Sequence, residues 1–444
     1  CCPMSAPDSG GAANELLDRP MAIRVFICLS SASFFSYALR TINAAIAPEL
    51  VAEFNLTNAQ LGYLSSAYFF AFALMQIPLG IWLDRLGSRR VHFTLLLLAA
   101  AGCVVFASAS TVQGLWIGRA MIGAGFAGGL MAALRVYRFW YAIDRQQQLV
   151  SLMMVVGTAG ALMATVPSRM VLEVIGWRGL FLVVGGLILV SGASIFLQLP
   201  RNEKLKRPEP GVAPSQGGLG FAGYKIVLRD PFFWRFLVPA IVLQGGFIAF
   251  QSLWAGPWLT KVVGLSAQQA AQVLFVFNLV LMFAYLALSS LVRVIARRGW
   301  TLLHVNTVTS VCIIALHLGM SNAGGATIGI ALWLLWAVLT TTYTPVQTWV
   351  CLTFPDQIAG RALTAFNFVL FSGVFLVQWL FGVLVDWCIT WSASEADAFR
   401  NALRIWVGLE VVALAWMVMF RVRAYNERNP SPVSYTHLRA HETA

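Results

Sequence analysis

The sequence predicts an all-α membrane protein with twelve transmembrane helices, arranged as two six-helix bundles related by pseudo-symmetry. Three observations lead to this prediction: the composition, a recurring pattern of apolar runs and an internal repeat. The chain of 444 residues is 59% hydrophobic and 11% charged, whereas soluble domains contain roughly 25% charged residues. This composition excludes an ordinary soluble fold.

Charge and cysteine usage exclude further classes of protein. The chain has a net charge of +12, but its basic residues fall in short loops between apolar runs rather than on one surface with interleaved aromatics. We therefore expect a lipid bilayer, and no nucleic acid, as the partner of these charges. The seven cysteines show neither disulfide nor metal spacing, so no cofactor and no metal are expected.

Apolar runs long enough to cross a membrane recur along the chain. A hydrocarbon core of about 30 Å requires about 20 apolar residues in a helix. Twelve runs meet this requirement, and each predicts one spanning helix. The predicted spans are residues 23–48, 59–83, 91–110, 113–136, 149–173, 179–199, 233–259, 269–292, 301–320, 325–352, 361–386 and 400–420.

A polar stretch rich in proline and glycine separates the sixth run from the seventh, which favours a linker. We expect an N-terminal bundle over 22–199, a cytoplasmic linker over 200–231, a C-terminal bundle over 232–421 and a cytoplasmic tail over 422–444. The two halves repeat each other at an offset of 209 residues. The matching pairs include Pro48 with Pro257, Thr57 with Ser266, Gln60 with Gln269 and Arg89 with Arg298. Parallel repeats place a substrate site at their interface.

Basic residues predict the orientation of the chain. The loops on the side of the linker contain most of them, and the opposite loops contain only Arg169, Arg178, Lys261, Arg400 and Arg404. The positive-inside rule then places both termini in the cytoplasm, and we expect the cytoplasmic (inner) membrane of a bacterium. We also expect the native chain to start at Met4 or Met21, and part of the sequence after Pro432, where the composition changes abruptly, to be non-native.

A dense charge cluster lies between the second and third predicted helices, over residues 80–90. Gly80 would allow a close approach to a neighbouring helix, and Gly87 would permit a turn. Asp84 could accept hydrogen bonds from arginines or from a helix N-terminus. The cluster also contains Arg85, Arg89 and Arg90. It predicts a cytoplasmic hinge between two membrane helices, the alternative being an ordinary basic loop.

At its glycines, aspartate and arginines this cluster resembles the loop between helices 2 and 3 of the major facilitator superfamily. Arg119, Gly123 and Gly125 are similar to the R-x-x-x-G-x-G signature of helix 4 in that superfamily. Arg40 and Asn43 resemble the R-x-x-N of helix 1 in its anion:cation symporter branch, although Ala124 stands where that branch often has a glutamate. The resemblance covers nearly all of residues 22–421.

The resemblance implies a secondary transporter whose two halves rock about a central site. It also implies a gating role for the charge cluster, which would latch the cytoplasmic ends of the halves together when the site opens outward. The residues assigned to gating are Gly80, Asp84, Arg85, Gly87, Arg89 and Arg90.

Arg40 and Arg119 are the basic residues that lie well inside the predicted membrane. An arginine at the centre of a bilayer costs about 2.5 to 3.5 kcal/mol on insertion scales, so it should face a cavity or a partner. Ser33, Ser36, Arg40 and Asn43 share one face of the first helix, and we expect this stripe to line a water-filled cavity. Because that helix has no acid in its core, Arg40 could bind a carboxylate, a phosphate or another oxyanion. The alternative is a structural arginine held by backbone carbonyls.

Other polar residues inside the spans are assigned with Arg40 to the substrate site. They are Asn43, Tyr68, Gln251, Tyr343, Gln347 and Asn367. Each could instead make a contact between helices. The candidates for energy coupling are Arg119 and Glu410, the latter being the one acid in the middle of a predicted span, whereas His317 is expected to be structural.

The sequence thus predicts a monomeric secondary active transporter that moves a small organic anion, such as a carboxylate or a sugar acid, with a proton as the candidate coupling ion. The alternatives are an exporter of hydrophobic compounds, a transporter of an inorganic anion (nitrate or phosphate), and a non-transporting sensor with the same fold. An enzyme is not expected, because neither a G-x-S-x-G nor an H-E-x-x-H motif occurs.

Overall fold

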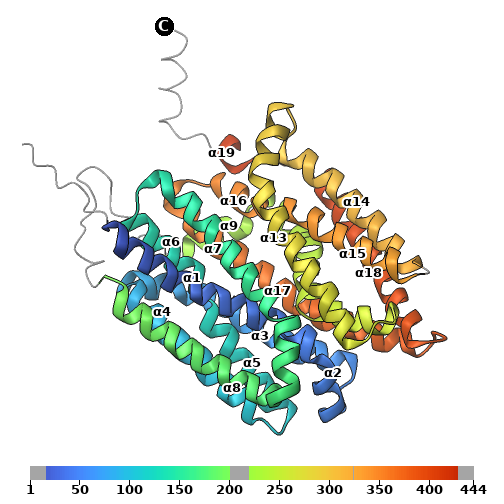
Figure 1. Ribbon diagram of the computed structural model, residues 1–444. Helices are drawn as coiled ribbons and strands as arrows, with labels where there is room; N and C mark the ends of the chain where they lie inside the picture. Colours follow the sequence, from blue (N-terminus) through green and yellow to red (C-terminus); the bar gives the residue numbers. More distant parts are fainter. Residues whose placement is uncertain (1–16, 201–219, 324, 429–444) are drawn as a thin grey trace, which may run out of the picture.

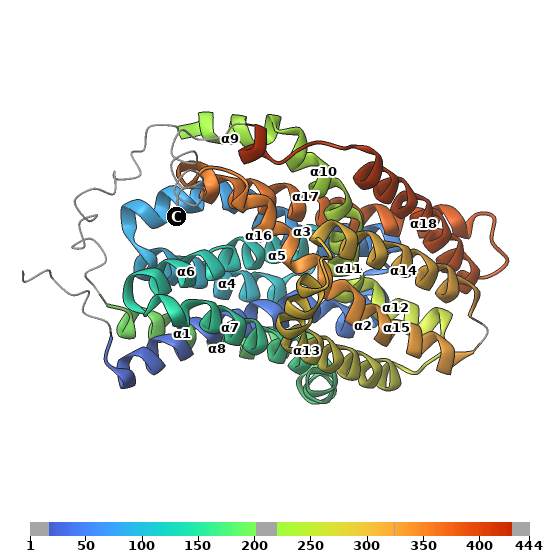
Figure 2. The same ribbon diagram turned by 90° about the horizontal axis from the view of Figure 1, so that it is seen from above.

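The computed structural model describes residues 17–200, 220–323 and 325–428. Within these ranges the chain forms helices and connecting turns, with no strand. Figure 1 shows the helices coloured blue to green gathered on one side and most of those coloured yellow to red on the other, and Figure 2 shows the same two groups after a rotation of 90°. We call them the N-terminal group, α1 to α8, and the C-terminal group, α9 to α19.

The N-terminal group consists of α1 (Arg19–Thr41), α2 (Asn43–Phe54), α3 (Asn58–Leu86), α4 (Ser88–Ser108), α5 (Val112–Phe126), α6 (Gly129–Trp140), α7 (Ile143–Met163) and α8 (Val166–Gln198). The C-terminal group consists of α9 (Gly220–Arg229), α10 (Pro231–Pro239), η1 (Ala240–Gly245), α11 (Gly246–Ala249), η2 (Phe250–Trp254), α12 (Ala255–Pro257), η3 (Trp258–Val262), α13 (Ala267–Arg297), α14 (Leu302–Asn322), α15 (Ala326–Thr340), η4 (Thr341–Tyr343), α16 (Thr344–Leu352), α17 (Asp356–Ile389), α18 (Glu395–Met419) and α19 (Tyr425–Arg428).

The prediction of twelve spans is confirmed. Among the described residues, 11 helical segments are long and apolar enough to cross a membrane, and the shorter apolar segment Gln148–Met163 supplies the twelfth. Gly176 interrupts α8 with a φ of +68°, a conformation that glycine adopts without steric cost. Residues 166–175 therefore extend the fifth predicted span, and residues 177–198 form the sixth.

The chain alternates between two ends of the molecule. One end carries the turns at Gly87, at residues 141–142 and at residues 298–301, together with both sides of the expected linker; we call it the linker end. The other, which we call the far end, carries the turns at residues 55–57, 109–111, 263–266 and 390–394. Within the expected linker, α9 is helical, whereas residues 201–219 and the tail residues 429–444 lie outside the described ranges.

Aliphatic side chains cover the outside of the helices. Val174, Leu197 and Met419 have exposed fractions of 82%, 75% and 78%. Large exposed apolar surfaces are rare on proteins that stay in water, and lipid is the environment in which they are favourable. The exposed apolar surface and the apolar helices therefore both indicate an integral membrane protein.

The internal repeat is reproduced at the starts of two matched helices. In α3, the amide of Gln60 donates to Thr57 Oγ1 (3.2 Å) and the amide of Thr57 donates to Gln60 Oε1 (3.0 Å). At the start of α13, Ser266 and Gln269 make the same two bonds, also at 3.2 and 3.0 Å. Such a capping box satisfies two backbone donors that the helix itself leaves unpaired. This equivalence supports the register of 209 residues.

The first span is interrupted where Arg40 stands, because α1 ends at Thr41 and α2 begins at Asn43. Farther along, Pro48 has no N–H to donate to the carbonyl of Ala44. Gly256 of α12 lies against that carbonyl, since a Cβ atom on Gly256 would come within 2.3 Å of the Ala44 oxygen. The two groups therefore meet backbone to backbone on the far-end side of Arg40.

Glycines in the N-terminal group provide a test of helix packing. A Cβ atom on Gly123 would come within 2.0 Å of the Tyr68 carbonyl oxygen, whereas one on Gly186 would meet nothing within 4 Å. We expect Gly123→Ala to destabilise the protein by about 1 to 3 kcal/mol, because α3 and α5 must move apart. Gly186→Ala is the matched control and should leave the melting temperature in detergent unchanged or slightly raised. Equal melting temperatures for the two variants would contradict the close contact.

Candidate functional site

Arg40 lies between the two groups and is half-buried. Five aromatic rings surround its guanidinium, with centroids 4.9 to 5.9 Å from the guanidinium carbon. They belong to Tyr37 of α1, to Tyr68, Phe69 and Phe72 of α3, and to Phe371 of α17. We call these five side chains the aromatic cage. A cation at this distance from a ring face is stabilised by roughly 0.5 to 2 kcal/mol, so rings from both groups hold the guanidinium in place.

No acid in the described part of the chain is paired with Arg40. Among the described residues, Arg40 makes no ion pair and no hydrogen bond, and its buried Nε atom has no partner. Aromatic rings offset only part of the lost hydration of a guanidinium, because they accept no strong hydrogen bonds from its N–H groups. An anion that accepted two parallel N–H bonds would satisfy these donors. The site is therefore suited to a carboxylate.

The expectation that the polar stripe of the first helix lines a water-filled cavity is wrong for three of its four members. Ser33, Ser36 and Asn43 have exposed fractions of only 6%, 8% and 3%. Ser36 Oγ lies 3.1 Å from the hydroxyl of Tyr68, so at this position α3 packs over the stripe. Asn43 Oδ1 is buried without a partner. Only Arg40 remains partly accessible.

Arg119 of α5 fixes the backbone next to Arg40. Its side chain is 1% exposed, its Nη1 donates to the Leu39 carbonyl at 2.8 Å, and its guanidinium carbon lies 4.9 Å from the ring of Phe106. The structural arrangement that the sequence left open for Arg40, a buried arginine tied to a backbone carbonyl, is thus found at Arg119. The role of Arg119 in coupling stays a prediction.

Two pairs of amide side chains connect helices of the C-terminal group. Gln347 Nε2 of α16 donates to Asn367 Oδ1 of α17 at 2.7 Å, and Gln251 Nε2 of η2 donates to Asn278 Oδ1 of α13 at 2.8 Å. Asn367 precedes the cage residue Phe371 by one helical turn. Each amide keeps further donors and acceptors.

The structure does not bring Tyr343 to the other site candidates. Its side chain is 1% exposed, and its hydroxyl contacts Ser310 Oγ and lies 3.4 Å from the Asn306 carbonyl oxygen of α14. The ring belongs to the 3-10 turn Thr341–Tyr343 between α15 and α16, and this turn packs against α14. Tyr343 therefore makes a contact between helices, which is the alternative interpretation that the sequence offered for this residue.

The structure describes part of the predicted gate at residues 80–90. Gly87 ends α3 with a φ of +78°, so the expected turn is present. The expected close helix contact at Gly80 is not, because a Cβ atom there would meet nothing within 4 Å. Arg89 donates to the Phe196 carbonyl and stacks on that ring at 4.2 Å, within its own group. Arg85 and Arg90 are exposed, and the Asp84 side chain lies outside the described residues.

Glu410 of α18 pairs with His317 of α14. His317 Nδ1 lies 2.9 and 3.0 Å from the two carboxylate oxygens, and both side chains are 1% exposed. The His317 ring also stands edge-on to Trp336 of α15, with centroids 4.4 Å apart. The pair ties three helices of the C-terminal group together. The expected structural role of His317 fits this geometry, and the coupling role of Glu410 stays a prediction.

Sequence reasoning missed most of the cage. Tyr37, Phe69, Phe72 and Phe371 lie in apolar runs where aromatic residues are common, and only Tyr37, three residues before Arg40 on the same helix, had a local signal. Tyr285 of α13 was also missed. Its side chain is half-buried and interacts electrostatically with Tyr37 and Arg40. Contacts between helices distant in the sequence leave no such local pattern.

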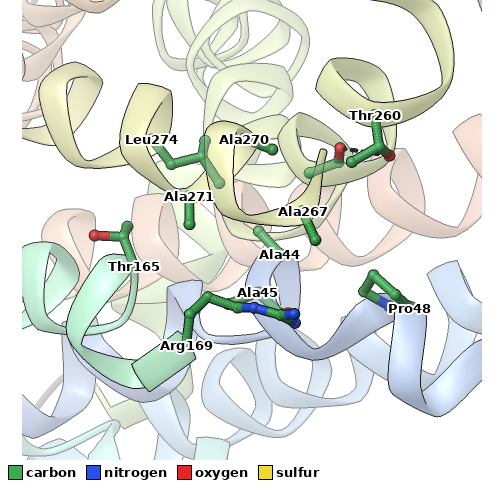
Figure 3. Close-up of a pocket in the computed structure, with 11 residues that line it drawn as sticks. Ala44, Ala45, Pro48, Thr165, Arg169, Thr260, Ala267, Ala270, Ala271 and Leu274 are labelled. Atoms are coloured by element: carbon green, nitrogen blue, oxygen red, sulfur yellow. Dashed lines mark hydrogen bonds between the residues drawn. The ribbon is translucent and has the colours of Figure 1, made fainter. Parts of the chain in front are cut away.

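Toward the far end a small cavity of about 20 Å³ lies between the two groups. Figure 3 shows Arg169 reaching beneath Ala45, with Ala267 and Ala271 on the opposite side. A volume of this size holds about one water molecule. Nearby, Arg178 and Trp177 donate hydrogen bonds to Glu53, and the bond from Arg178 is the larger cause of a lowered pKa of that carboxyl.

The chain matches the family model of the Major Facilitator Superfamily over residues 29–378. The hexuronate transporter of Escherichia coli (strain K12) is 27% identical over 247 residues, which are 53% of this chain and 56% of that protein. The galacturonate transporter of Dickeya chrysanthemi is 25% identical over 247 residues, which are 53% of this chain and 71% of that protein. The chain thus spans little more than half the length of the hexuronate transporter.

Solved structures agree on the fold. A bacterial homologue of the human lysosomal transporter Spinster, in an inward-facing and unoccupied conformation, has a TM-score of 0.75 and 18% identity over 91% of this chain and 98% of that one. A D-xylose-proton symporter has a TM-score of 0.71 and 15% identity over 90% and 98% of the two chains. Because the family model covers most of this sequence and these structures share its architecture, the chain belongs to the Major Facilitator Superfamily.

Proposed function

We propose that the protein is a secondary transporter that carries a sugar acid, or a similar small organic anion, across a membrane by alternating access. The observation on which the proposal rests is the half-buried guanidinium of Arg40, which lies between the two groups with no acidic partner among the described residues. A planar guanidinium binds a carboxylate through two parallel hydrogen bonds. The amide pairs of the C-terminal group provide partners for sugar hydroxyls.

The relatives support the same class of substrate. Two of them are named for hexuronate and galacturonate, and a third, the D-galactonate transporter of Escherichia coli O6:H1, is 26% identical over 284 residues, which are 60% of this chain and 66% of that protein. All three substrates combine one carboxylate with several hydroxyl groups. This combination matches a single arginine with two tyrosine side chains beside it.

Uptake by purified protein in liposomes tests the proposal. We expect saturable uptake of labelled D-galacturonate and little uptake of labelled D-galactose, because galactose lacks the carboxylate that Arg40 would bind. Unlabelled D-glucuronate should compete, whereas nitrate, phosphate and hydrophobic cations should not. Equal uptake of the acid and the neutral sugar, or competition by nitrate or phosphate alone, would contradict the proposal. Binding without counterflow of labelled substrate would indicate a sensor instead.

We further propose that the monomer lies in the cytoplasmic membrane of a bacterium, with both termini in the cytoplasm and residues 22–199 and 232–421 rocking as two bundles. The positive-inside rule supports this orientation, since the linker end carries most of the basic residues. It places the far end outside the cell. A proton is the proposed coupling ion. An inward-directed proton gradient should then accelerate uptake but leave exchange at equilibrium unchanged.

A further inference from the structure

At the far end a carboxylate connects the two groups. Asp386 lies in the last turn of α17, and its Oδ1 accepts hydrogen bonds from the backbone N of Asn58 (3.2 Å) and from Asn58 Nδ2 (2.9 Å). Its Oδ2 accepts a third bond from the backbone N of Ala59 (2.8 Å). Asn58 and Ala59 are the first residues of α3, where backbone N–H groups have no acceptor within the helix. One carboxylate of the C-terminal group thus caps a helix of the N-terminal group.

The charge of Asp386 strengthens this contact. The first turn of a helix carries a partial positive charge, and a carboxylate beside it is stabilised. Hydrogen bonds to a charged acceptor are about twice as strong as those between neutral groups. An amide side chain at position 386 would keep an oxygen acceptor but would lose the charge.

The backbones beneath the carboxylate are in direct contact. A Cβ atom on Gly382 would come within 2.3 Å of the Asn58 carbonyl oxygen, and one on Gly62 would come within 2.7 Å of the Gln378 carbonyl oxygen. Gln378, Gly382 and Asp386 are spaced four residues apart and share one face of α17. Three successive turns of α17 therefore close on the start of α3, and α3 cannot move away without breaking the bonds to Asp386.

Other charged contacts at this end stay within one group. Arg169 pairs with Glu49 and Arg178 with Glu53 in the N-terminal group, and Lys261 pairs with Glu395 in the C-terminal group. For the far-end residues that the structure describes, the hydrogen bonds between the groups are the three that end on Asp386. Between α2 and α13, small alanines line the cavity of Figure 3 instead.

We propose that Asp386 is the latch that holds the far end closed, and that it must release the start of α3 before the Arg40 site can open on that side. The proposal rests on alternating access as proposed above, but it concerns the conformation of the protein and not the identity of its substrate. Release of the latch would allow α17 to carry Phe371 away from the aromatic cage, because Phe371 and Asp386 belong to the same helix.

Distances between spin labels test the latch without any substrate. In a cysteine-free background, cysteines at Ser110 and Ala393 place labels on exposed far-end turns, one in each group. Wild-type protein in lipid nanodiscs should give mainly the short distance. Asp386→Ala should raise the ratio of long to short distances by about tenfold or more, since a single hydrogen bond to a charged group contributes at least this factor. Asp386→Asn should give an intermediate shift.

The matched control is Asp397→Asn. Asp397 is also an acid near the far end, but its hydrogen bonds from Ser394 and Arg400 stay within the C-terminal group. This variant should keep the wild-type distances. Unchanged distances in both Asp386 variants, with an unchanged melting temperature, would overturn the latch even if galacturonate uptake is found. A shift in the Asp386 variants without uptake of any tested anion would support the latch and contradict the proposed substrate.

Discussion

Replacement of Arg40 by lysine is expected to reduce uptake of labelled galacturonate by roughly 10- to 100-fold, although the positive charge is kept. Lysine presents a single ammonium and cannot form the two parallel hydrogen bonds that a guanidinium makes with a carboxylate. Its compact charge also fits poorly among the five flat rings of the cage. The measurement is the initial rate of uptake into liposomes as a function of galacturonate concentration.

Arg24→Lys is the matched control for this prediction. Arg24 lies on the same helix, but it is exposed near the linker end. The same chemical change there should leave uptake within about twofold of wild type, because exposed charges contribute little. If Arg40→Lys transports at the wild-type rate, Arg40 is not the residue that anchors the anion. The aromatic cage would then have a structural role.

His317→Ala is expected to give the largest loss of stability, about 3 to 5 kcal/mol. The variant leaves the Glu410 carboxylate in a position that is 1% exposed, without its imidazole partner. It also removes the edge-on contact with Trp336, which adds to the loss. Thermal unfolding in detergent, followed by intrinsic fluorescence, measures the effect.

Glu395→Gln serves as the comparison, because Glu395 and Lys261 form a pair whose side chains are 46% and 35% exposed. Water stabilises both charges there, so the loss should stay below about 1 kcal/mol. Similar melting temperatures for His317→Ala and Glu395→Gln would show that the buried pair is not a major source of stability.

The variant Glu410→Gln distinguishes a structural role of Glu410 from a role in proton coupling. A glutamine can still bond to His317 but cannot carry a proton, so it should be better tolerated than His317→Ala. If Glu410 is the coupling residue, this variant should lose the acceleration by a proton gradient and keep exchange at equilibrium. Gradient-driven accumulation at the wild-type level would remove Glu410 from the coupling mechanism.

The number of spans and the position of Arg40 inside one of them could be predicted from the sequence because both depend on local composition. Each apolar run must be long enough to span the hydrocarbon, and Arg40 is conspicuous in such a run because charge there is costly. The repeat was visible for a related reason, since the capping residues of α3 and α13 are short local motifs at a fixed offset. The kink at Gly176 had no comparable signal.

The partners of the polar residues could not be predicted in this way. Tyr343 and Gln347 are both polar residues in the tenth predicted span, yet Tyr343 bonds to Ser310 of α14 and Gln347 to Asn367 of α17. The turn that contains Tyr343 packs against α14 and α16 packs against α17, and these neighbours decide which partner each side chain meets. Likewise, Asp386 lies at the end of an apolar run and has no nearby charge in the sequence to mark it.

The sequence by itself determined that the chain is a twelve-span membrane protein, that its halves repeat, and that Arg40 lies in an apolar span without a neighbouring acid. Only the tertiary structure decided which rings surround that arginine, that Arg119 fixes its backbone and that Asp386 caps α3. The reason is physical: hydrophobicity and helix spacing act between residues close in the chain. Cation–π contacts and caps between the two groups depend instead on the packing of helices that are distant in the sequence.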